Sequence, residues 1–97
     1  MAIFEEHCRE SLRFFGNEYK AVHRWLDEYA GVEGIGMRHR KYRHHLAGIE
    51  ELVAIMGENV REVAIRHVMT DLKEEGWIEG KDPFPKDKED YIKMGLF

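Results

Sequence analysis

The feature that most constrains this chain is the spacing of its apolar side chains, which recur three or four residues apart in four successive stretches. That spacing places apolar side chains on one face of a helix. The two prolines, Pro83 and Pro85, stand near the end of the sequence, so proline bars no earlier residue from a helix. Alternating runs of β-branched residues, which half-buried strands require, do not occur in the sequence. The sequence therefore predicts an all-α fold.

The four stretches predict helices over residues 2–15, 18–30, 37–56 and 60–75, separated by glycine-containing connections. Four antiparallel helices with short connections bury four apolar stripes against one another. We therefore expect residues 1–97 to form one helical domain resembling a four-helix bundle. The tail, residues 80–97, contains an Asp-Pro-Phe-Pro turn and is predicted to lie across the bundle as a short helix or an extended strap.

Composition narrows the class of protein further. The chain has 97 residues, of which 43% are apolar and 35% charged, as in a soluble globular domain and unlike a disordered segment. No stretch approaches the roughly 20 uncharged apolar residues of a membrane span. The first residues lack a secretion signal pattern, and the single cysteine, Cys8, reads as a small core residue. We therefore expect a cytoplasmic protein without a membrane segment.

Six histidines lie within the first 67 residues, and three polar residues are predicted to point into the core. On one continuous helix over residues 37–56, His45 falls in the middle of the apolar stripe. On the helix over residues 60–75, His67 and Asp71 lie one turn apart inside an apolar arc. A carboxylate in such a position is costly to bury unless it is paired, hydrogen-bonded or bound to a cation.

A second pair, His23 and Asp27, has the same four-residue spacing on the predicted second helix, and His44 lies beside the stripe that contains His45. Helix bundles build metal sites from side chains of facing helices, and imidazole with carboxylate suits zinc, iron or manganese. The candidate metal ligands are therefore His45, His67, Asp71, His23, Asp27 and His44. The alternative is a metal-free core network, in which His67 donates to Asp71 or Asp71 pairs with an arginine such as Arg38. His7 and His39 are expected at exposed or edge positions.

Residues 38–45 form a basic segment, with no acidic residue anywhere between Glu33 and Glu50. Its four fixed positive charges are candidates for contacting the phosphates of a nucleic acid or nucleotide: Arg38, Arg40, Lys41 and Arg43. The other interpretation pairs them with carboxylates of the protein itself or of an acidic partner. The formal net charge of −4 makes the chain as a whole a poor polyanion binder.

Three sequence blocks resemble a family of small bacterial, archaeal and phage proteins of unknown function. The blocks are Val-His-Arg-Trp-Leu-Asp at 22–27, Arg-His-Arg at 38–40 followed by His44-His45 and Gly48-Ile49, and His67 with Asp71-Leu72. The resemblance covers most of residues 19–72 and implies no reaction. The chain is also loosely similar to metal-dependent phosphohydrolases of the HD type, whose ligands run His, His-Asp, Asp. This sequence has no His-Asp dipeptide.

Two functions follow from these residues. The first is a His/Asp site at the centre of the bundle that binds a divalent metal or a phosphate-bearing ligand; an enzyme built on it would be a metal-dependent hydrolase acting on a phosphoester. The second is a non-enzymatic interaction or regulatory module, in which the histidines are structural and residues 38–45 dock an acidic partner or a nucleic acid. A homo-oligomer formed through a leftover apolar face is compatible with both.

Overall fold

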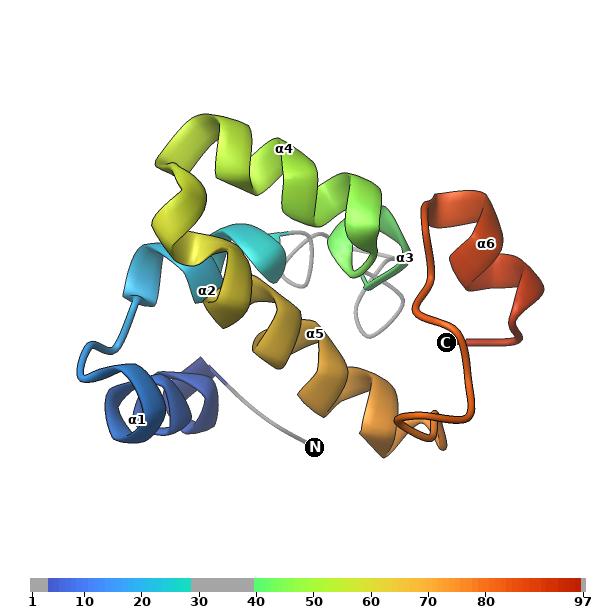
Figure 1. The fold of residues 1–97 in the computed structure, drawn as a ribbon, viewed down its shortest axis with the longest axis horizontal. Helices are drawn as coiled ribbons and strands as arrows, with labels where there is room; N and C mark the ends of the chain where they lie inside the picture. Colours follow the sequence, from blue (N-terminus) through green and yellow to red (C-terminus); the bar gives the residue numbers. More distant parts are fainter. Residues whose placement is uncertain (1–3, 29–39, 97) are drawn as a thin grey trace.

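The computed structural model (Figure 1) describes residues 4–28 and 40–96. Within these two ranges the chain forms α-helices, the 3-10 helix η3 and no strand, which confirms the predicted all-α class. The elements are α1 (Phe4–Phe15), α2 (Lys20–Leu26), α3 (Arg40–Arg43), α4 (Leu46–Met56), η3 (Glu58–Val60), α5 (Arg61–Glu74) and α6 (Lys88–Lys93).

Helix α5 lies at the centre of the fold and packs against α1, α2 and α4 (Figure 1). The apolar side chains of α5 recur at helical spacing, so they share one face of the helix, and that face is buried in the core. Helices α2 and α4 contribute the facing side chains, and the C-terminal region closes the core with Trp77 and Tyr91. The main buried apolar side chains are Val22, Leu26, Ile49, Leu52, Val63, Val68 and Leu72.

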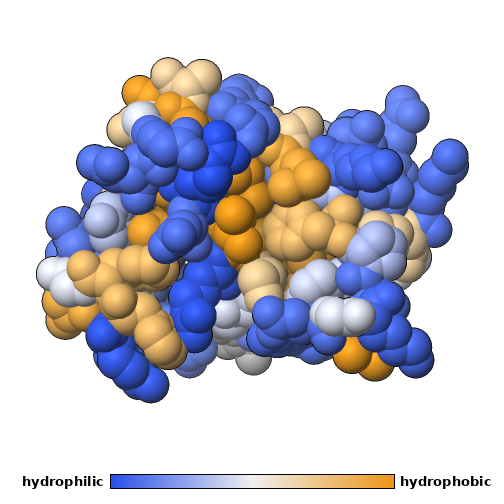
Figure 2. Space-filling model, viewed as in Figure 1, coloured by the Kyte–Doolittle hydropathy of each residue, from blue (hydrophilic) through white to orange (hydrophobic). Residues whose placement is uncertain are grey.

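On the face shown in Figure 2, apolar surface forms a band through the middle of the molecule and hydrophilic side chains flank it. Partly buried apolar side chains pack over the core, among them Met69, Phe84 and Met94. None of the helices in residues 4–28 and 40–96 is long and apolar enough to cross a bilayer.

The second helix is shorter than the predicted 18–30. It begins at Lys20 because Tyr19 adopts a left-handed conformation, with φ of 51°, and Asn17 Oδ1 accepts a hydrogen bond from the Tyr19 amide at 3.0 Å. It ends at Leu26, and Asp27 follows as its C-cap. The predicted extension beyond Glu28, like the start of the helix predicted at residue 37, lies outside the described residues.

The prediction of one helix up to Met56 is wrong at His44 and His45, where the chain bends and divides into α3 and α4. His45 is extended, with φ of −158°, and caps α4 by accepting a hydrogen bond from the Gly48 amide at Nδ1. The first two amides of α4, those of Leu46 and Ala47, donate to the carbonyls of Pro85 and Lys86. The first amides of α4 thus find their hydrogen-bond acceptors in a segment that is distant in the sequence, and no local sequence pattern reveals this pairing.

The last predicted helix is found as η3 followed by α5, and it therefore begins with a 3-10 turn. The tail forms the short helix α6 with Asp87 as its N-cap, whose side chain accepts a hydrogen bond from the Asp90 amide at 2.8 Å. Figure 1 shows α6 beside α3, away from α1. The predicted strap is thus a short helix with an extended approach, and Met94 and Leu96 rest on the core.

Candidate metal centre

Four side-chain atoms from three helical regions converge in the interior, next to the apolar core. His44 follows α3, His67 and Asp71 lie one turn apart on α5, and Asp27 caps the end of α2. His44 and His67 are at most 1% exposed and Asp71 is 2% exposed, whereas the Asp27 side chain is 24% exposed. The two imidazoles and the two carboxylates thus meet where water has little access, except beside Asp27.

The distances between these atoms match the ligand shell of a small tetrahedral cation. His44 Nε2 lies 2.9 Å from Asp71 Oδ2 and 3.5 Å from Asp27 Oδ1. His67 Nε2 lies 3.4 Å from Asp71 Oδ2 and 3.3 Å from Asp27 Oδ1. Ligand atoms at 2.0–2.1 Å around a tetrahedral zinc ion are about 3.3–3.4 Å apart. One potential ligand atom from each of the four residues lies within 4.8 Å of those of the other three, so the group could hold a metal ion.

The orientation of the two rings agrees with the same geometry. The ring centroids of His44 and His67 are 5.1 Å apart and the rings are tilted by 54°. Two imidazoles that bind one tetrahedral ion through Nε2 have centroids about 5.2 Å apart. Both Nε2 atoms lie within 3.5 Å of the same two carboxylate oxygens, Asp27 Oδ1 and Asp71 Oδ2.

Arg40 holds the carboxylate of Asp71 from the opposite side. Its Nη2 lies 3.3 Å from Asp71 Oδ1, and its Nη1 donates to the Asp71 backbone carbonyl at 3.2 Å. The guanidinium is itself buried, at 3% exposed, and pairs with Glu74 and Glu75, each at 3.2 Å. Asp71 Oδ1 is thus directed at a cation of the protein, while Oδ2 faces the two histidines. Metal-ligating carboxylates are commonly held in place by a second layer of protein groups, and the ion pair with Arg40 is a contact of this kind.

The other ring nitrogen of His67 is held in the same way. His67 Nδ1 lies 2.8 Å from His23 Nδ1, and His23 Nε2 lies 2.7 Å from Ser11 Oγ. If a cation were bound at His67 Nε2, His67 Nδ1–H would donate to His23 Nδ1, and His23 Nε2–H would donate to Ser11 Oγ. In that arrangement His23 would orient His67 and would not itself hold the ion.

The electrostatics of the site assign different charges to its histidines. Burial lowers the pKa of His44 to about 4 and, together with the neighbouring His67, the pKa of His23 to about 3, so both rings are neutral at pH 7. Burial also opposes the charged form of His67, but Asp27 and Asp71 outweigh it and raise the His67 pKa to about 9. For Asp71, burial raises the pKa, and the hydrogen bonds from His44 and His67 more than reverse this, leaving it far below the usual range.

His7, expected at an exposed or edge position, is instead 2% exposed and stacks on His67 with a centroid distance of 3.7 Å and an interplanar angle of 20°. His7, His23 and His67 also bring ring nitrogens within 4.8 Å of one another. Because lone pairs lie in the ring plane, two rings stacked in parallel cannot both direct them at one ion. The three-histidine group is therefore a packing arrangement, and His7 Nε2 faces Asp71 Oδ1 at 3.2 Å without good hydrogen-bond geometry.

His45 does not join the site, although the continuous helix placed it at the centre. The bend at His44–His45 rotates the helix phase, so His44 enters the core, and His45 turns back to cap α4 and to contact the Lys41 carbonyl at 3.1 Å. His44, His67, Asp71 and Asp27 come together, and His23 lies behind His67. The sequence analysis did not place Ser11 or His7 at the site. The two are four residues apart and flank the face of the first helix that contains Cys8, which is the signal that could have indicated their burial.

The basic segment is largely engaged inside the molecule. Arg40 is paired with three carboxylates, as described above. Arg43 donates to the Trp25 carbonyl at 2.6 Å, lies 3.4 Å from Glu28 and stacks over the Trp25 ring at 3.8 Å. Lys41 lies 5.5 Å from the centroid of the Tyr42 ring. Arg38 and His39 lie outside the described residues.

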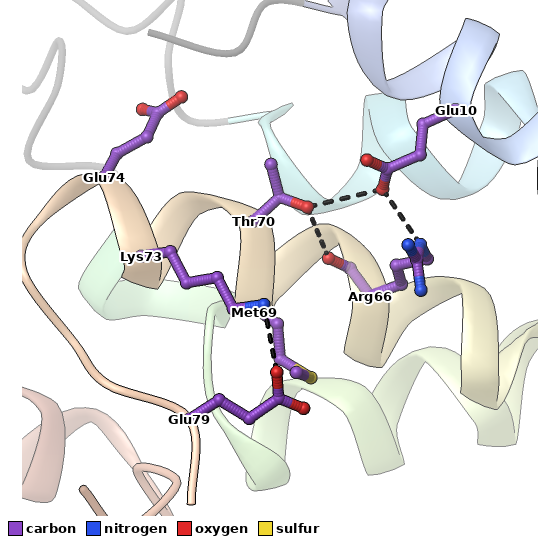
Figure 3. Close-up of a pocket in the computed structure, with 7 residues that line it drawn as sticks. All are labelled: Glu10, Arg66, Met69, Thr70, Lys73, Glu74 and Glu79. Carbon is purple, nitrogen blue, oxygen red and sulfur yellow. Dashed lines mark hydrogen bonds and ion pairs between the residues drawn. The ribbon is translucent and has the colours of Figure 1, made fainter. Parts of the chain in front are cut away.

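A groove of about 570 Å³ lies elsewhere, between α1 and α5 (Figure 3). Its charged side chains pair with one another: Glu10 lies 3.3 Å from Arg66 and accepts from Thr70 at 3.3 Å, and Lys73 lies 3.0 Å from Glu79. A groove with internally paired charges offers no convergent set of groups to a ligand, so the buried His/Asp centre remains the stronger candidate.

Fold and site together define a small all-α domain with a buried His/Asp centre that could hold a metal ion. The chain belongs to the family described as Domain of unknown function (DUF6915), whose model matches residues 2–94. Searches of curated proteins and of solved structures find no match to the chain. The family's description assigns no activity, so a functional proposal rests on the geometry of the site.

Proposed function

We propose that the protein binds one divalent metal ion, with Zn²⁺ fitting best, through His44 Nε2, His67 Nε2, Asp27 Oδ1 and Asp71 Oδ2. The observation that carries the proposal is the set of four cross-distances of 2.9–3.5 Å between imidazole nitrogens and carboxylate oxygens. Only two of them are hydrogen bonds by geometry, since one ring N–H cannot serve two carboxylates well. Four donor atoms around a common point are better satisfied by a cation.

Charge favours a metal ion over a phosphate-bearing ligand at this position. The two carboxylates carry two negative charges, which one divalent ion neutralises. Arg40 faces Asp71 as well, but its own charge is also met by Glu74 and Glu75. A phosphate group in the same place would meet Asp27 and Asp71 at close range and would be repelled.

The ligand number favours a structural metal over a catalytic one. Four protein ligands complete the tetrahedral shell of zinc, whereas catalytic zinc keeps one position open. A hydrolase acting on a phosphoester requires one ligand to leave, and Asp27 is the ligand that solvent reaches, at 24% side-chain exposure. We infer that the ion mainly holds together α2, α3 and α5, which are too short to be stable alone.

The competing function is a metal-free interaction module. It is supported by the raised pKa of His67, because the protonated His67 ring, with Asp27 and Asp71 beside it, can supply positive charge in place of the cation at neutral pH. It is also supported by exposed apolar side chains on α1, where Leu12 and Phe14 are each 51% exposed. In that case the His/Asp centre is a buried ion network, and its role is to fix the packing of the helices.

Adjacent histidines provide a matched test. Untagged protein is stripped of metal and titrated with Zn²⁺ in competition with a chromophoric chelator, alongside His44→Gln and His45→Gln. We expect one Zn²⁺ per chain for the parent and for His45→Gln, and a loss of at least about 100-fold in affinity for His44→Gln. At a free Zn²⁺ concentration 100 times Kd, the parent should gain about 2.7 kcal/mol in stability.

Two results overturn the proposal. The first is a parent protein that takes up no Zn²⁺, Fe²⁺ or Mn²⁺ after reconstitution and melts identically with and without chelator. The second is an equal loss of binding in the two variants, because His45 Nδ1 and Nε2 are both engaged in capping contacts away from the four ligand atoms.

A further inference from the structure

The C-terminal segment, residues 81–96, contacts the surroundings of the proposed metal site through a buried tyrosine. Tyr91 on α6 is completely buried, and its hydroxyl donates to Glu75 Oε2 at 2.8 Å. The same carboxylate oxygen accepts from Arg40 Nη1 at 3.2 Å. Glu75 therefore receives one hydrogen bond from the C-terminal segment and one from the arginine that holds Asp71.

Arg40 carries this contact to the ligand itself. Its other terminal nitrogen, Nη2, lies 3.3 Å from Asp71 Oδ1, while Asp71 Oδ2 faces His44 at 2.9 Å. The two oxygens belong to one rigid carboxylate group. A shift of the guanidinium consequently rotates or displaces the oxygen that faces the metal position.

The segment also meets the site along a second, independent path. The carbonyls of Pro85 and Lys86 accept hydrogen bonds from the amides of Leu46 and Ala47 at 3.0 and 2.9 Å. These amides start α4, directly after His44 and His45. The segment thus holds the backbone next to His44. Through Tyr91, Glu75 and Arg40 it also contacts the carboxylate of Asp71, which faces His44.

Building on the proposed function, the geometry points to Tyr91 as a positioning residue for the metal site, so that docking of residues 81–96 and metal binding stabilise each other. Linkage requires the effect to be reciprocal: if the docked segment raises the affinity for the ion, the ion stabilises the docked segment by the same factor. The hydroxyl of Tyr91 acts through Glu75 and Arg40 and touches neither the ion nor its ligands. Its loss therefore weakens binding without removing a ligand.

The test compares Tyr91→Phe and Glu75→Gln with Tyr19→Phe, a control that removes a hydroxyl outside this network. Zn²⁺ affinity is measured by chelator competition, and the Co²⁺-loaded proteins are compared by their visible absorption spectra, which report ligand geometry. We expect Glu75→Gln to weaken Zn²⁺ binding roughly tenfold and Tyr91→Phe by a smaller factor of about three or more. Tyr19→Phe should stay within about twofold of the parent, because it leaves the contacts to Arg40 intact.

Amide exchange supplies a readout that a purely structural tyrosine would not move. Zn²⁺ should slow exchange in α6 of the parent, and this response should shrink in Tyr91→Phe. Unchanged Zn²⁺ affinity and Co²⁺ spectra in both Tyr91→Phe and Glu75→Gln, with no effect of Zn²⁺ on α6, would overturn the inference while leaving the metal site standing. A parent that binds no metal would overturn both proposals. If Tyr91→Phe fails to fold, Glu75→Gln decides the question by itself, because it preserves the shape of the acceptor.

Discussion

Gly48→Ala is expected to damage both the fold and the proposed metal centre, because no side chain fits at this position in the first turn of α4. A Cβ atom there would collide with the carbonyl oxygen of Arg43 and would lie 2.8 Å from its Cα. Ordinary contacts begin at 3.4 Å, so the end of α3 would have to retreat by more than an ångström. The colliding atoms are backbone atoms, and no rotamer change relieves them.

The size of the effect follows from two opposing terms. Overpacking in a tightly packed region costs typically about 1–3 kcal/mol. Replacing glycine by alanine inside a helix returns at most about 1 kcal/mol. Since the clash involves backbone, we place the packing cost at the upper end and expect a net loss of about 2 kcal/mol. For a domain of this size that corresponds to a lowering of the melting temperature by about 8–16 °C.

Metal binding should suffer beyond this loss, because His44 follows Arg43 directly in the sequence. Metal ligands must be held within about 0.5 Å of their working positions. Urea unfolding followed by circular dichroism, with chelator and with saturating Zn²⁺, separates the two effects. The control is Ala47→Gly, at an exposed position of the same turn, which should cost about 1 kcal/mol and leave Zn²⁺ affinity unchanged. If Gly48→Ala matches the parent in stability, the close contact between α3 and α4 does not exist and the argument fails.

Three further predictions concern buried groups. Arg40→Met should destabilise the metal-free protein by about 3–5 kcal/mol in urea unfolding, since it leaves the buried Asp71 without its arginine; a loss below about 1 kcal/mol would contradict the buried pairing. His45→Ala should cost about 1 kcal/mol through loss of the α4 cap, whereas His45→Asn, which can accept the same hydrogen bond, should recover most of it. Cys8 should react with iodoacetamide far more slowly in the folded protein than in urea, because the thiol is 3% exposed and burial raises its pKa; equal rates would refute its placement.

Helix identity and two members of the site could be predicted from local spacing. Residues 60–75 keep one helical phase from η3 through α5, so His67 and Asp71 point into the core as their one-turn separation predicts. The amphipathic pattern suffices there because both the helix and its buried face depend on the same periodicity. His23 and Asp27 have the same spacing, but that spacing does not show which of them joins the candidate site. The structure places Asp27 Oδ1 within 3.5 Å of both His44 Nε2 and His67 Nε2.

His44 enters the core in place of the predicted His45, and this difference shows what local sequence patterns cannot predict. Two adjacent histidines differ by 100° on a continuous helix, so the break between α3 and α4 decides which of them enters the core. That break depends on the carbonyls of Pro85 and Lys86, which lie some forty residues away in the sequence and satisfy the first amides of α4.

The sequence by itself therefore determined the helical class, the core faces of its regular helices and the His67–Asp71 pair, because these depend on contacts within one helix. Tertiary structure alone decided which residues meet in the candidate site, the burial of His7 and the inward pairing of Arg40, because each requires atoms from separate elements. Charged side chains show no periodicity that distinguishes a buried pair from a solvated face. Arg40, at the start of α3, can be buried because three carboxylates at the C-terminal end of α5 surround its guanidinium: Asp71, Glu74 and Glu75.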